Sequence, residues 1–261
     1  MSYIKLIKYP GSKNNLISTI NELFLKSGAV VLVDVFGGSG IVPLNIEASQ
    51  VVYNDLNKDL YNLFNMIRLY PNLLLEVMNK WTRSKEEFVE YREVLNAKGM
   101  VNMTDIDRAF RTFYGFNVGF GGMGSTYRTQ KEKSSYSQTL KVISNYGVIS
   151  SRISKWKIEN LDFREVFRRF DSLKTFFYCD PPYSGKNWYE YQFDQNDLED
   201  LMKVITDIRG KYLLSFDESD QGVKDIFGVP DLVVELESKN KKKNEYEQPP
   251  IRRFSIYTNV A

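Results

Sequence analysis

The chain of 261 residues contains no histidine and a single cysteine, Cys179. Histidine is the usual general base near neutral pH and the commonest metal ligand. Its absence argues against a zinc centre, a Ser-His-Asp triad and a Cys-His pair. One cysteine excludes a disulfide within the chain and is typical of a reducing compartment. Any reaction assigned to this chain must therefore proceed without imidazole.

The sequence also lacks a strong net charge and a long apolar run. With 35 basic and 33 acidic residues, the formal charge is +2, so any surface that binds a polyanion must be local. No run is long enough to span a bilayer, and Met1–Tyr9 has lysines but no apolar core, so we expect no signal peptide. A hydrophobic content of 43% suits one sizeable core with a smaller domain inserted or appended.

The most informative stretch is an aromatic run that ends abruptly. Thr175–Cys179 has the composition and length of a buried strand, and Asp180-Pro181-Pro182-Tyr183 follows it directly. Consecutive prolines cannot continue a ladder, because neither has an N–H to donate. The strand therefore delivers an acid, a rigid turn and an aromatic ring to the edge of a sheet, where ligands bind in open α/β sheets.

A second strand leads into glycines. Val30–Phe36 is apolar apart from Asp34, Gly37-Gly38-Ser39-Gly40 follows, and Ile41–Ile46 predicts the start of a helix. Strand, glycine loop and helix together bring backbone close to a ligand. The spacing is not the full dinucleotide-binding fingerprint, so a loop that merely needs glycine remains an alternative.

The next predicted strand, Val51–Tyr53, also ends in an acid, Asp55. Asp55 lies 21 positions after Asp34, close to the spacing of about 20 at which an acid accepts hydrogen bonds from a ribose. The two acids and the glycine loop together favour a ligand that carries a nucleoside.

The alternation of strands and helices is interrupted after residue 70. Helical patterns cover 73–81, 85–95 and 105–116 with no strand between them, and the α/β pattern resumes near residue 145. We therefore expect a catalytic domain formed by 1–70 and 145–261, with 71–144 inserted as a mainly helical domain.

Two segments are candidates for local basic surfaces. The first, 113–128, is rich in glycine and aromatic residues and is followed by Lys131 and Lys133. The second, 238–244, holds Lys241, Lys242 and Lys243. Stacking rings and cations suit contact with nucleic acid. A solvated loop with no partner is the alternative for both.

Five motifs in order carry a resemblance to a known family. They are Tyr9-Pro10-Gly11-Ser12-Lys13, Asp34-Val35-Phe36-Gly37-Gly38-Ser39-Gly40, Asn54-Asp55, Leu161-Asp162-Phe163 and Asp180-Pro181-Pro182-Tyr183. Together they resemble the Dam-like (alpha group, D12 class) DNA adenine-N6 methyltransferases, which use S-adenosylmethionine. The resemblance implies an α/β fold, a Rossmann-like class I methyltransferase sheet of seven strands with an inserted, mainly helical target-recognition domain.

The resemblance also implies roles for single residues. Those expected to hold the cofactor are Tyr9, Lys13, Asp34, Phe36, Gly37, Gly38, Ser39, Gly40, Asp55, Asp162 and Phe163. Those expected at the target base are Asp180, Pro181, Pro182 and Tyr183. We expect Asn117, Arg128, Lys131, Lys133, Lys241, Lys242 and Lys243 to contact double-stranded DNA.

The chemistry expected at the turn needs no metal. Hydrogen bonds from the adenine amine to the Asp180 carboxylate and the Pro181 carbonyl would aim the nitrogen lone pair at the sulfonium methyl. Tyr183 would stack on a base that has left the duplex. We expect action on DNA in the interior of a cell or virus-infected cell, with no membrane, and with a cognate restriction endonuclease as a candidate partner.

Several alternatives remain open. A cytosine-N4 methyltransferase often has serine at the position of Asp180, and RNA amino groups and protein glutamine amides are approached through similar turns. A non-catalytic DNA-binding relative is a different class of protein, which the intact Asp180 and glycine loop disfavour. The residues after Asn117 depart from GATC-reading members, so the recognition sequence stays open.

Overall fold

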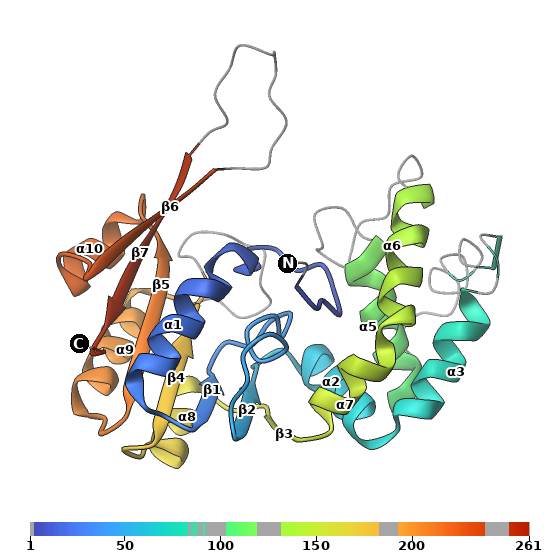
Figure 1. The fold of residues 1–261 in the computed structure, drawn as a ribbon, viewed down its shortest axis with the longest axis horizontal. Helices are drawn as coiled ribbons and strands as arrows, with labels where there is room; N and C mark the ends of the chain where they lie inside the picture. The colour runs from blue at the N-terminus through green and yellow to red at the C-terminus, as the bar shows by residue number, and fades with distance from the viewer. Residues whose placement is uncertain are drawn as a thin grey trace, which may run out of the picture. The chain divides into compact units, whose positions relative to one another are not determined.

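The computed structural model describes residues 3–82, 84, 86–87, 91, 103–118, 132–182, 193–237 and 251–260. They contain a seven-stranded sheet with the order β3-β2-β1-β4-β5-β7-β6 (Figure 1). The chain forms two compact units, one of residues 1–14 and 37–161, the other of residues 15–36 and 162–261. Mostly parallel strands joined by helices confirm the predicted α/β class.

The second unit contains most of the sheet. Its strands are β1 (Val31–Asp34), β4 (Thr175–Cys179), β5 (Lys211–Asp217), β6 (Leu232–Glu237) and β7 (Ile251–Thr258). The first three are parallel, and β7 pairs antiparallel with both β5 and β6. The first residues of β7, Ile251 and Arg252, pair with β6 and not with β5, so β6 and β7 continue past β5 as a ribbon (Figure 1).

Helices cover both faces of β4. The helices of the second unit are α1 (Ile17–Ser27), α8 (Phe163–Phe170), α9 (Gln195–Asp207) and α10 (Gln221–Phe227). Successive strand residues point to opposite faces. The Phe176 ring meets Phe24 of α1 with centroids 5.6 Å apart, and the Phe177 ring meets Phe167 of α8 at 4.5 Å. Both faces of β4 are therefore buried, as its continuous apolar run predicts.

The first unit is mainly helical. It contains β2 (Gln50–Asn54), β3 (Trp156–Glu159), α2 (Lys58–Leu69), α3 (Pro71–Trp81), α5 (Asp105–Val118), α6 (Glu132–Ser144) and α7 (Tyr146–Ile153). Every described element between α2 and β3 is a helix. The boundaries expected for the inserted domain, 71–144, stay a prediction.

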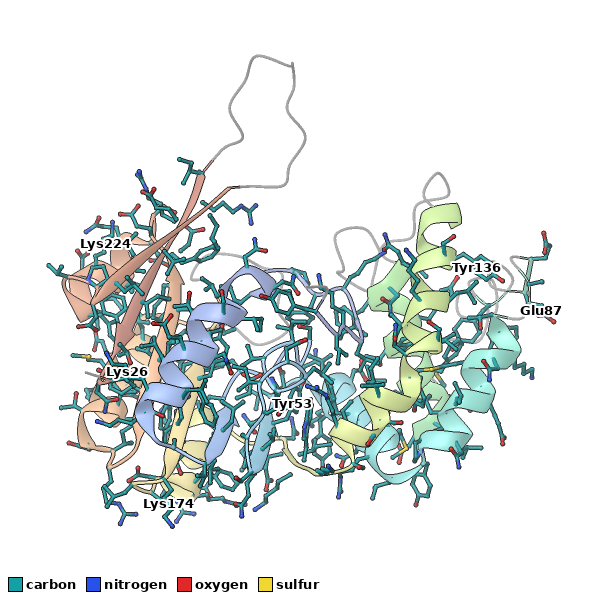
Figure 2. All side chains as sticks on the ribbon, in the orientation of Figure 1. Lys26, Tyr53, Glu87, Tyr136, Lys174 and Lys224 are labelled. Carbon is teal, nitrogen blue, oxygen red and sulfur yellow. The ribbon has the colours of Figure 1, made fainter. Side chains whose placement is uncertain are left out.

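An aromatic stack holds the two strands of this unit against α2. Tyr53, labelled in Figure 2, is fully buried. Its ring lies 4.2 Å from that of Phe64 and 6.1 Å from that of Trp156, centroid to centroid. Farther along the unit, the Tyr136 hydroxyl donates to the Thr82 carbonyl at 3.1 Å and ties α6 to the end of α3.

Two local predictions are wrong. Ile41–Ile46 forms turns and no helix. The side-chain amide of Asn45 donates to the Ile41 carbonyl at 2.8 Å, whereas in a helix this carbonyl would accept from a backbone N–H. The same amide pairs with both backbone groups of Ile4, at 2.8 Å each. Ser12 precedes an amphipathic segment, which predicts that it caps a helix, but the first helix begins at Ile17 after a short 3₁₀ turn. Asp194 caps α9 in a capping box with Asp197.

Arg164 of α8 joins two helices. Its guanidinium contacts Asp197 at 2.7 Å and Asp200 at 2.9 Å, both on α9. It also bonds the Asp162 carboxylate at 3.1 Å. These half-exposed pairs fix α8 against α9 more through geometry than through a large free energy, since solvent screens them. Within the described ranges, no helix is long and apolar enough to cross a membrane.

Candidate functional site

The first unit holds Asp55 in a fixed position beside the glycine loop. Its Oδ2 accepts from the Gly38 N–H at 2.7 Å and its Oδ1 accepts from the Asn57 N–H at 2.8 Å. Burial raises the pKa of the Asp55 carboxyl to about 6, against the opposing effect of these two backbone hydrogen bonds. Each oxygen keeps a further lone pair, so the carboxylate can still accept from a ligand hydroxyl.

The loop requires glycine for two physical reasons. Gly38 and Gly40 have φ of +49° and +65°, a region that side chains disfavour. A Cβ at Gly37 would stand 2.2 Å from Tyr53 Cε2, and one at Gly40 would stand 2.8 Å from Phe64 Cζ. The Tyr53 hydroxyl donates to the Gly38 carbonyl at 2.8 Å and closes the loop onto the core.

The N-terminal motif lies against this loop. A Cβ at Gly38 would be 3.0 Å from Tyr9 Cε1, so the Tyr9 ring covers the glycine directly. The Ser12 and Ser39 hydroxyls are 3.4 Å apart. Three of the predicted motifs, those at residues 9–13, 37–40 and 54–55, are therefore brought together in one unit.

Lys13 belongs to the same motif and is buried. Only 4% of its surface is exposed, and its Nζ donates to the Gly11 carbonyl at 3.2 Å. A buried ammonium next to a loop of backbone N–H groups suits a ligand with a carboxylate, such as the methionine end of the predicted cofactor.

The second unit brings Asp34 and Asp180 to one edge of the sheet. Asp34, 1% exposed, ends β1 in register with Tyr178 of β4, and the Val35 N–H donates to the Tyr178 carbonyl at 3.0 Å. Asp180 directly follows β4. Burial raises the pKa of the Cys179 thiol well above its usual value, and the charges of Asp34 and Asp180 raise it further. Both carboxylates therefore lie near this thiol, which stays neutral and unreactive.

Three phenylalanines cluster in the second unit. Centroids of the Phe36 and Phe163 rings, both expected at the cofactor, are 5.9 Å apart. The Phe193 ring lies 5.6 Å from Phe36 and 5.7 Å from Phe163. Phe193 was not among the residues expected at the site from the sequence. Its place directly before the capping residue Asp194, where apolar side chains often pack, was the available signal.

Asp162, predicted to contact the cofactor's adenine, makes structural hydrogen bonds within the second unit. It caps α8 by accepting from the Arg164 N–H at 2.9 Å, and it pairs with the Arg164 guanidinium. A carboxylate has room for further donors. Its contact with a cofactor stays a prediction.

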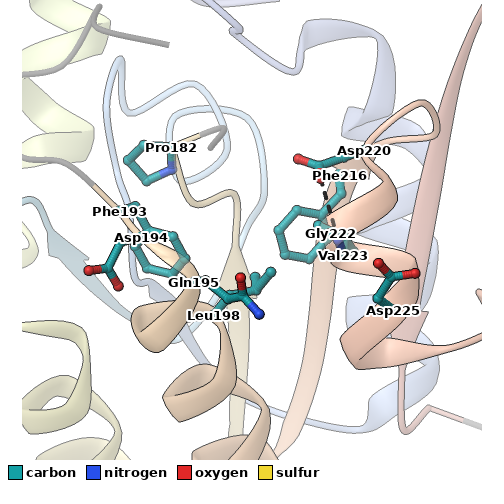
Figure 3. Close-up of a pocket in the computed structure, with 10 residues that line it drawn as sticks. All are labelled: Pro182, Phe193, Asp194, Gln195, Leu198, Phe216, Asp220, Gly222, Val223 and Asp225. Atoms are coloured by element: carbon teal, nitrogen blue, oxygen red, sulfur yellow. Dashed lines mark hydrogen bonds between the residues drawn. The ribbon is translucent and has the colours of Figure 1, made fainter. Parts of the chain in front are cut away.

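A small cavity of about 150 Å³ opens beside the proline turn (Figure 3). It lies at the carboxyl ends of β4 and β5 and is lined by Pro182, Phe193, Asp194, Gln195, Leu198, Phe216, Asp220, Gly222, Val223 and Asp225. In Figure 3 the Phe193 and Phe216 rings line opposite sides of it, and Asp220 caps α10 through the Val223 N–H at 3.3 Å. The cavity is smaller than the roughly 300–1,000 Å³ of drug-sized sites, so it suits one flat ring system.

Most predicted DNA contacts lie outside the described residues, as does Tyr183. The basic residues concerned are Arg128, Lys131, Lys241, Lys242 and Lys243. Lys133 lies in α6, where only the backbone is described. Asn117 is 2% exposed, and its amide donates to the carbonyls of Leu6 and Phe113. This gives the Asn117 side chain a structural role, and its contact with DNA stays a prediction.

Possible metal ligands do not gather in the described part of the chain. There, no three His, Cys, Asp or Glu side chains lie together in a way that could hold a metal ion.

Comparison with known proteins relates the chain to DNA methyltransferases. A DNA adenine methylase of Vibrio cholerae serotype O1 is 23% identical over 198 residues, which cover 68% of this chain and 64% of the relative. The modification methylase StsI of Streptococcus sanguinis is 25% identical over 69% of this chain and 29% of its own length. The chain thus matches less than two thirds of the length of these relatives.

A third relative aligns over most of both proteins. The type II methyltransferase M1.LlaDCHI of Lactococcus lactis subsp. cremoris is 24% identical over 84% of this chain and 83% of its own length. The family described as D12 class N6 adenine-specific DNA methyltransferase matches residues 9–242, a range that holds all five motifs. The chain belongs to the D12 class N6 adenine-specific DNA methyltransferase family.

Proposed function

We propose that this chain transfers a methyl group from S-adenosylmethionine to N6 of an adenine extruded from duplex DNA. The observation that carries the proposal is the family match over residues 9–242. It includes both the glycine loop with Asp55 and the turn that begins at Asp180. Two relatives are named as a DNA adenine methylase and a modification methylase, and these names agree with the proposal.

The glycine loop and its neighbours fit the proposed cofactor. Cβ atoms at Gly37, Gly38 and Gly40 would meet the rings of Tyr53, Tyr9 and Phe64, so packing fixes the path of the loop. Asp55 is held by two backbone N–H groups with its remaining lone pairs available for ribose hydroxyls. The cofactor, when bound, supplies an electrophilic methyl on a positively charged sulfur.

Asp180 and Pro181 are the residues proposed to prepare the nucleophile. The lone pair of an exocyclic amine is delocalised into the ring, which makes it a poor nucleophile. The Asp180 carboxylate and the Pro181 carbonyl accept hydrogen bonds from the two N–H groups of the adenine amine. These hydrogen bonds favour a pyramidal amine nitrogen. The prolines restrict the turn before substrate binds, so little ordering entropy remains to be lost.

The cavity beside Pro182 is the proposed place for the extruded base. Its apolar rings offer stacking, and its volume of about 150 Å³ admits a base more readily than a nucleotide. The carboxylates of Asp194, Asp220 and Asp225 at its lining disfavour phosphate and accept from amine donors. These features support an amino-bearing base as substrate.

Duplex DNA is the proposed substrate. The proposed place of action is the interior of a cell, where DNA is present. A cognate restriction endonuclease is a proposed partner, suggested by the modification methylase among the relatives. Cytosine-N4 and RNA amino groups are the alternative substrates, and analysis of the methylated base separates them from adenine.

The decisive experiment joins cofactor binding with methyl transfer. Purified protein is incubated with radiolabelled S-adenosylmethionine and unmethylated plasmid, and sequencing that detects N6-methyladenine then locates the modified sites. We expect Asp180→Ala to lower the transfer rate by at least about 100-fold and to change the cofactor Kd little. Asp207→Ala, at the exposed end of α9, is the matched control and should transfer at the wild-type rate. Wild-type activity in Asp180→Ala would falsify the assigned role.

A further inference from the structure

Asn45 joins the N-terminal segment of the chain to the turn that follows the glycine loop. Its side-chain oxygen accepts from the Ile4 N–H at 2.8 Å, and its side-chain nitrogen donates to the Ile4 carbonyl at 2.8 Å. The same nitrogen donates to the Ile41 carbonyl, also at 2.8 Å. Both polar atoms of this one side chain therefore hold backbone groups, and all three hydrogen bonds have ordinary lengths.

The turn that contains Asn45 is an extension of the glycine loop. The Gly40 N–H donates to the Gly37 carbonyl at 2.8 Å, and the Leu44 N–H donates to the Gly40 carbonyl at 3.0 Å. The backbone N–H of Asn45 donates to the Val42 carbonyl at 3.0 Å. Successive backbone hydrogen bonds thus run from Gly37 to Asn45, so the glycine loop sets the position of the asparagine.

The N-terminal segment depends on such contacts for its path. Residues 3–13 form bends and turns and lie outside any helix or strand. Leu6 and Ile7 are buried and attach the segment to the core of the first unit. Burial is non-directional, whereas the paired hydrogen bonds between Ile4 and Asn45 define one register of the segment.

The other end of this segment carries residues predicted to hold the cofactor. Tyr9 covers Gly38, and the Ser12 N–H donates back to the Tyr9 carbonyl at 3.3 Å. The Ser12 and Ser39 hydroxyls are 3.4 Å apart, and the buried Lys13 follows directly. The segment and the glycine loop are thus joined twice within one unit, at this hydroxyl pair and through the asparagine.

We propose that Asn45 is a positioning residue that holds Lys13 in place for the carboxylate of the cofactor. The inference rests on the proposed function, because it takes the buried Lys13 ammonium and the glycine loop as the site of the methionine end. Neither the family description nor the names of the relatives assign a role to Asn45.

The physical basis is preorganisation. Because Leu6 and Ile7 are buried, loss of the Asn45 side chain should loosen the register of the segment without unfolding the chain. Lys13 must then be ordered when the ligand binds, and the entropy cost of that ordering lowers the affinity. The cost applies only to a ligand with a group for Lys13 to hold. Asp55 is held by other backbone groups and should bind a ribose as before.

The test compares two ligands that share the nucleoside and differ at the methionine end. S-adenosylhomocysteine carries the amino-acid carboxylate, and methylthioadenosine lacks it. Calorimetry gives the Kd of each ligand for the wild type and for Asn45→Ala. We expect the substitution to raise the Kd of S-adenosylhomocysteine by at least about fivefold and to change that of methylthioadenosine by less than about twofold.

Two further variants separate positioning from a general loss of structure. Asn62→Ala is the matched control, because the buried Asn62 amide donates to the Asp105 carbonyl at 2.8 Å and joins α2 to α5. It should lower the melting temperature and leave the ratio of the two Kd values unchanged. Lys13→Met should weaken S-adenosylhomocysteine alone, and adding Asn45→Ala to it should have little further effect, because both act on the same carboxylate.

A measurement on the wild type needs no variant. Exchange of the Ile4 N–H, which donates to Asn45, should slow when S-adenosylhomocysteine is added and not when methylthioadenosine is added. Linkage requires this, because a ligand that binds the ordered segment more tightly must also favour its ordered state. NMR resolves this single amide, and it decides the matter alone if Asn45→Ala fails to fold.

The outcomes separate this inference from the proposed function. The inference is overturned, and the proposed function stands, if the wild type methylates DNA while Asn45→Ala weakens both ligands equally or neither of them. Exchange of the Ile4 N–H that ignores S-adenosylhomocysteine has the same meaning. If the wild type neither binds S-adenosylhomocysteine nor transfers a methyl group, the proposed function itself fails.

Discussion

The two compact units hold their predicted site residues in different ways. In the first unit, backbone groups do the positioning: Gly38 and Asn57 hold Asp55, and close contacts with Tyr53 and Phe64 leave no room for a Cβ in the loop. In the second unit, side chains do it: two acids lie near Cys179, and the rings of Phe36, Phe163 and Phe193 form a cluster. Backbone positioning tolerates almost no change of residue, whereas side-chain positioning should lose function in graded steps.

The largest effect is expected from a substitution in the glycine loop of the first unit. Gly37→Ala places a Cβ 2.2 Å from the fully buried Tyr53, and the stacked rings behind it cannot give way. We expect a loss of about 3 kcal/mol in the free energy of unfolding, with a drop of several degrees in Tm and loss of cofactor binding.

Gly147→Ala is the control for that substitution. A Cβ there meets nothing within 4 Å, and α7 accepts alanine better than glycine. Its stability should stay equal or rise by up to about 1 kcal/mol. Equal losses in both variants, measured by urea denaturation, would contradict the packing argument.

A substitution in the phenylalanine cluster of the second unit should have a smaller effect. Phe193→Ala removes one ring of the cluster with Phe36 and Phe163. An aromatic pair contributes about 0.5–1.5 kcal/mol beyond burial, so we expect the cofactor Kd to rise by about 2- to 12-fold with the protein still folded. Phe193→Tyr should bind nearly as the wild type. A wild-type Kd in the alanine variant, by calorimetry, would remove this ring from the cofactor site.

The raised pKa of Asp55, in the first unit, predicts that the stability of the folded state depends on pH. Its pKa is raised to about 6 by burial, so the folded state binds a proton between about pH 4 and 6 that the unfolded state has released. Its contribution to stability therefore falls as pH rises through that window and is constant above it.

Cofactor affinity should follow the opposite course, because ribose hydroxyls need the ionised acceptor. We expect the Kd of S-adenosylhomocysteine to rise below pH 6, approaching about tenfold per pH unit. Asp55→Asn should bind weakly and lose this dependence. A pH-independent Kd from about pH 5 to 8 in the wild type would contradict the assigned role.

The smallest effect is expected from the basic segment 238–244, which lies outside the described residues. Replacing Lys241, Lys242 and Lys243 with glutamine should weaken DNA binding modestly. It should reduce the slope of log Kd against log salt by up to about 0.9 for each phosphate that a lysine no longer neutralises. Matched replacement of Lys26, on the exposed side of α1, should leave the slope unchanged. An unchanged slope in the triple variant would exclude the loop from the DNA-binding surface.

Local signals predicted some elements well because their causes are local. The buried run Thr175–Cys179 forms β4 with the bounds expected, and the helical patterns at 73–81 and 105–116 lie within α3 and α5. The turn at 41–46 could not be predicted, because the competing hydrogen bonds come from Ile4, 41 residues away from Asn45. Phe193 was missed for the same reason, since its partners Phe36 and Phe163 are distant in sequence.

The sequence by itself determined the chemistry available to this protein: no imidazole, an Asp-Pro-Pro turn after a buried strand, a glycine loop and an acid one strand later. Those features depend on residue type and short spacing, which a sequence contains in full. Only the tertiary structure decided that Tyr9 covers Gly38, that Asp34 and Asp180 lie near one thiol, and that Asn117 is buried under the N-terminal segment. These depend on which surfaces pack together, and packing is a property of the whole fold.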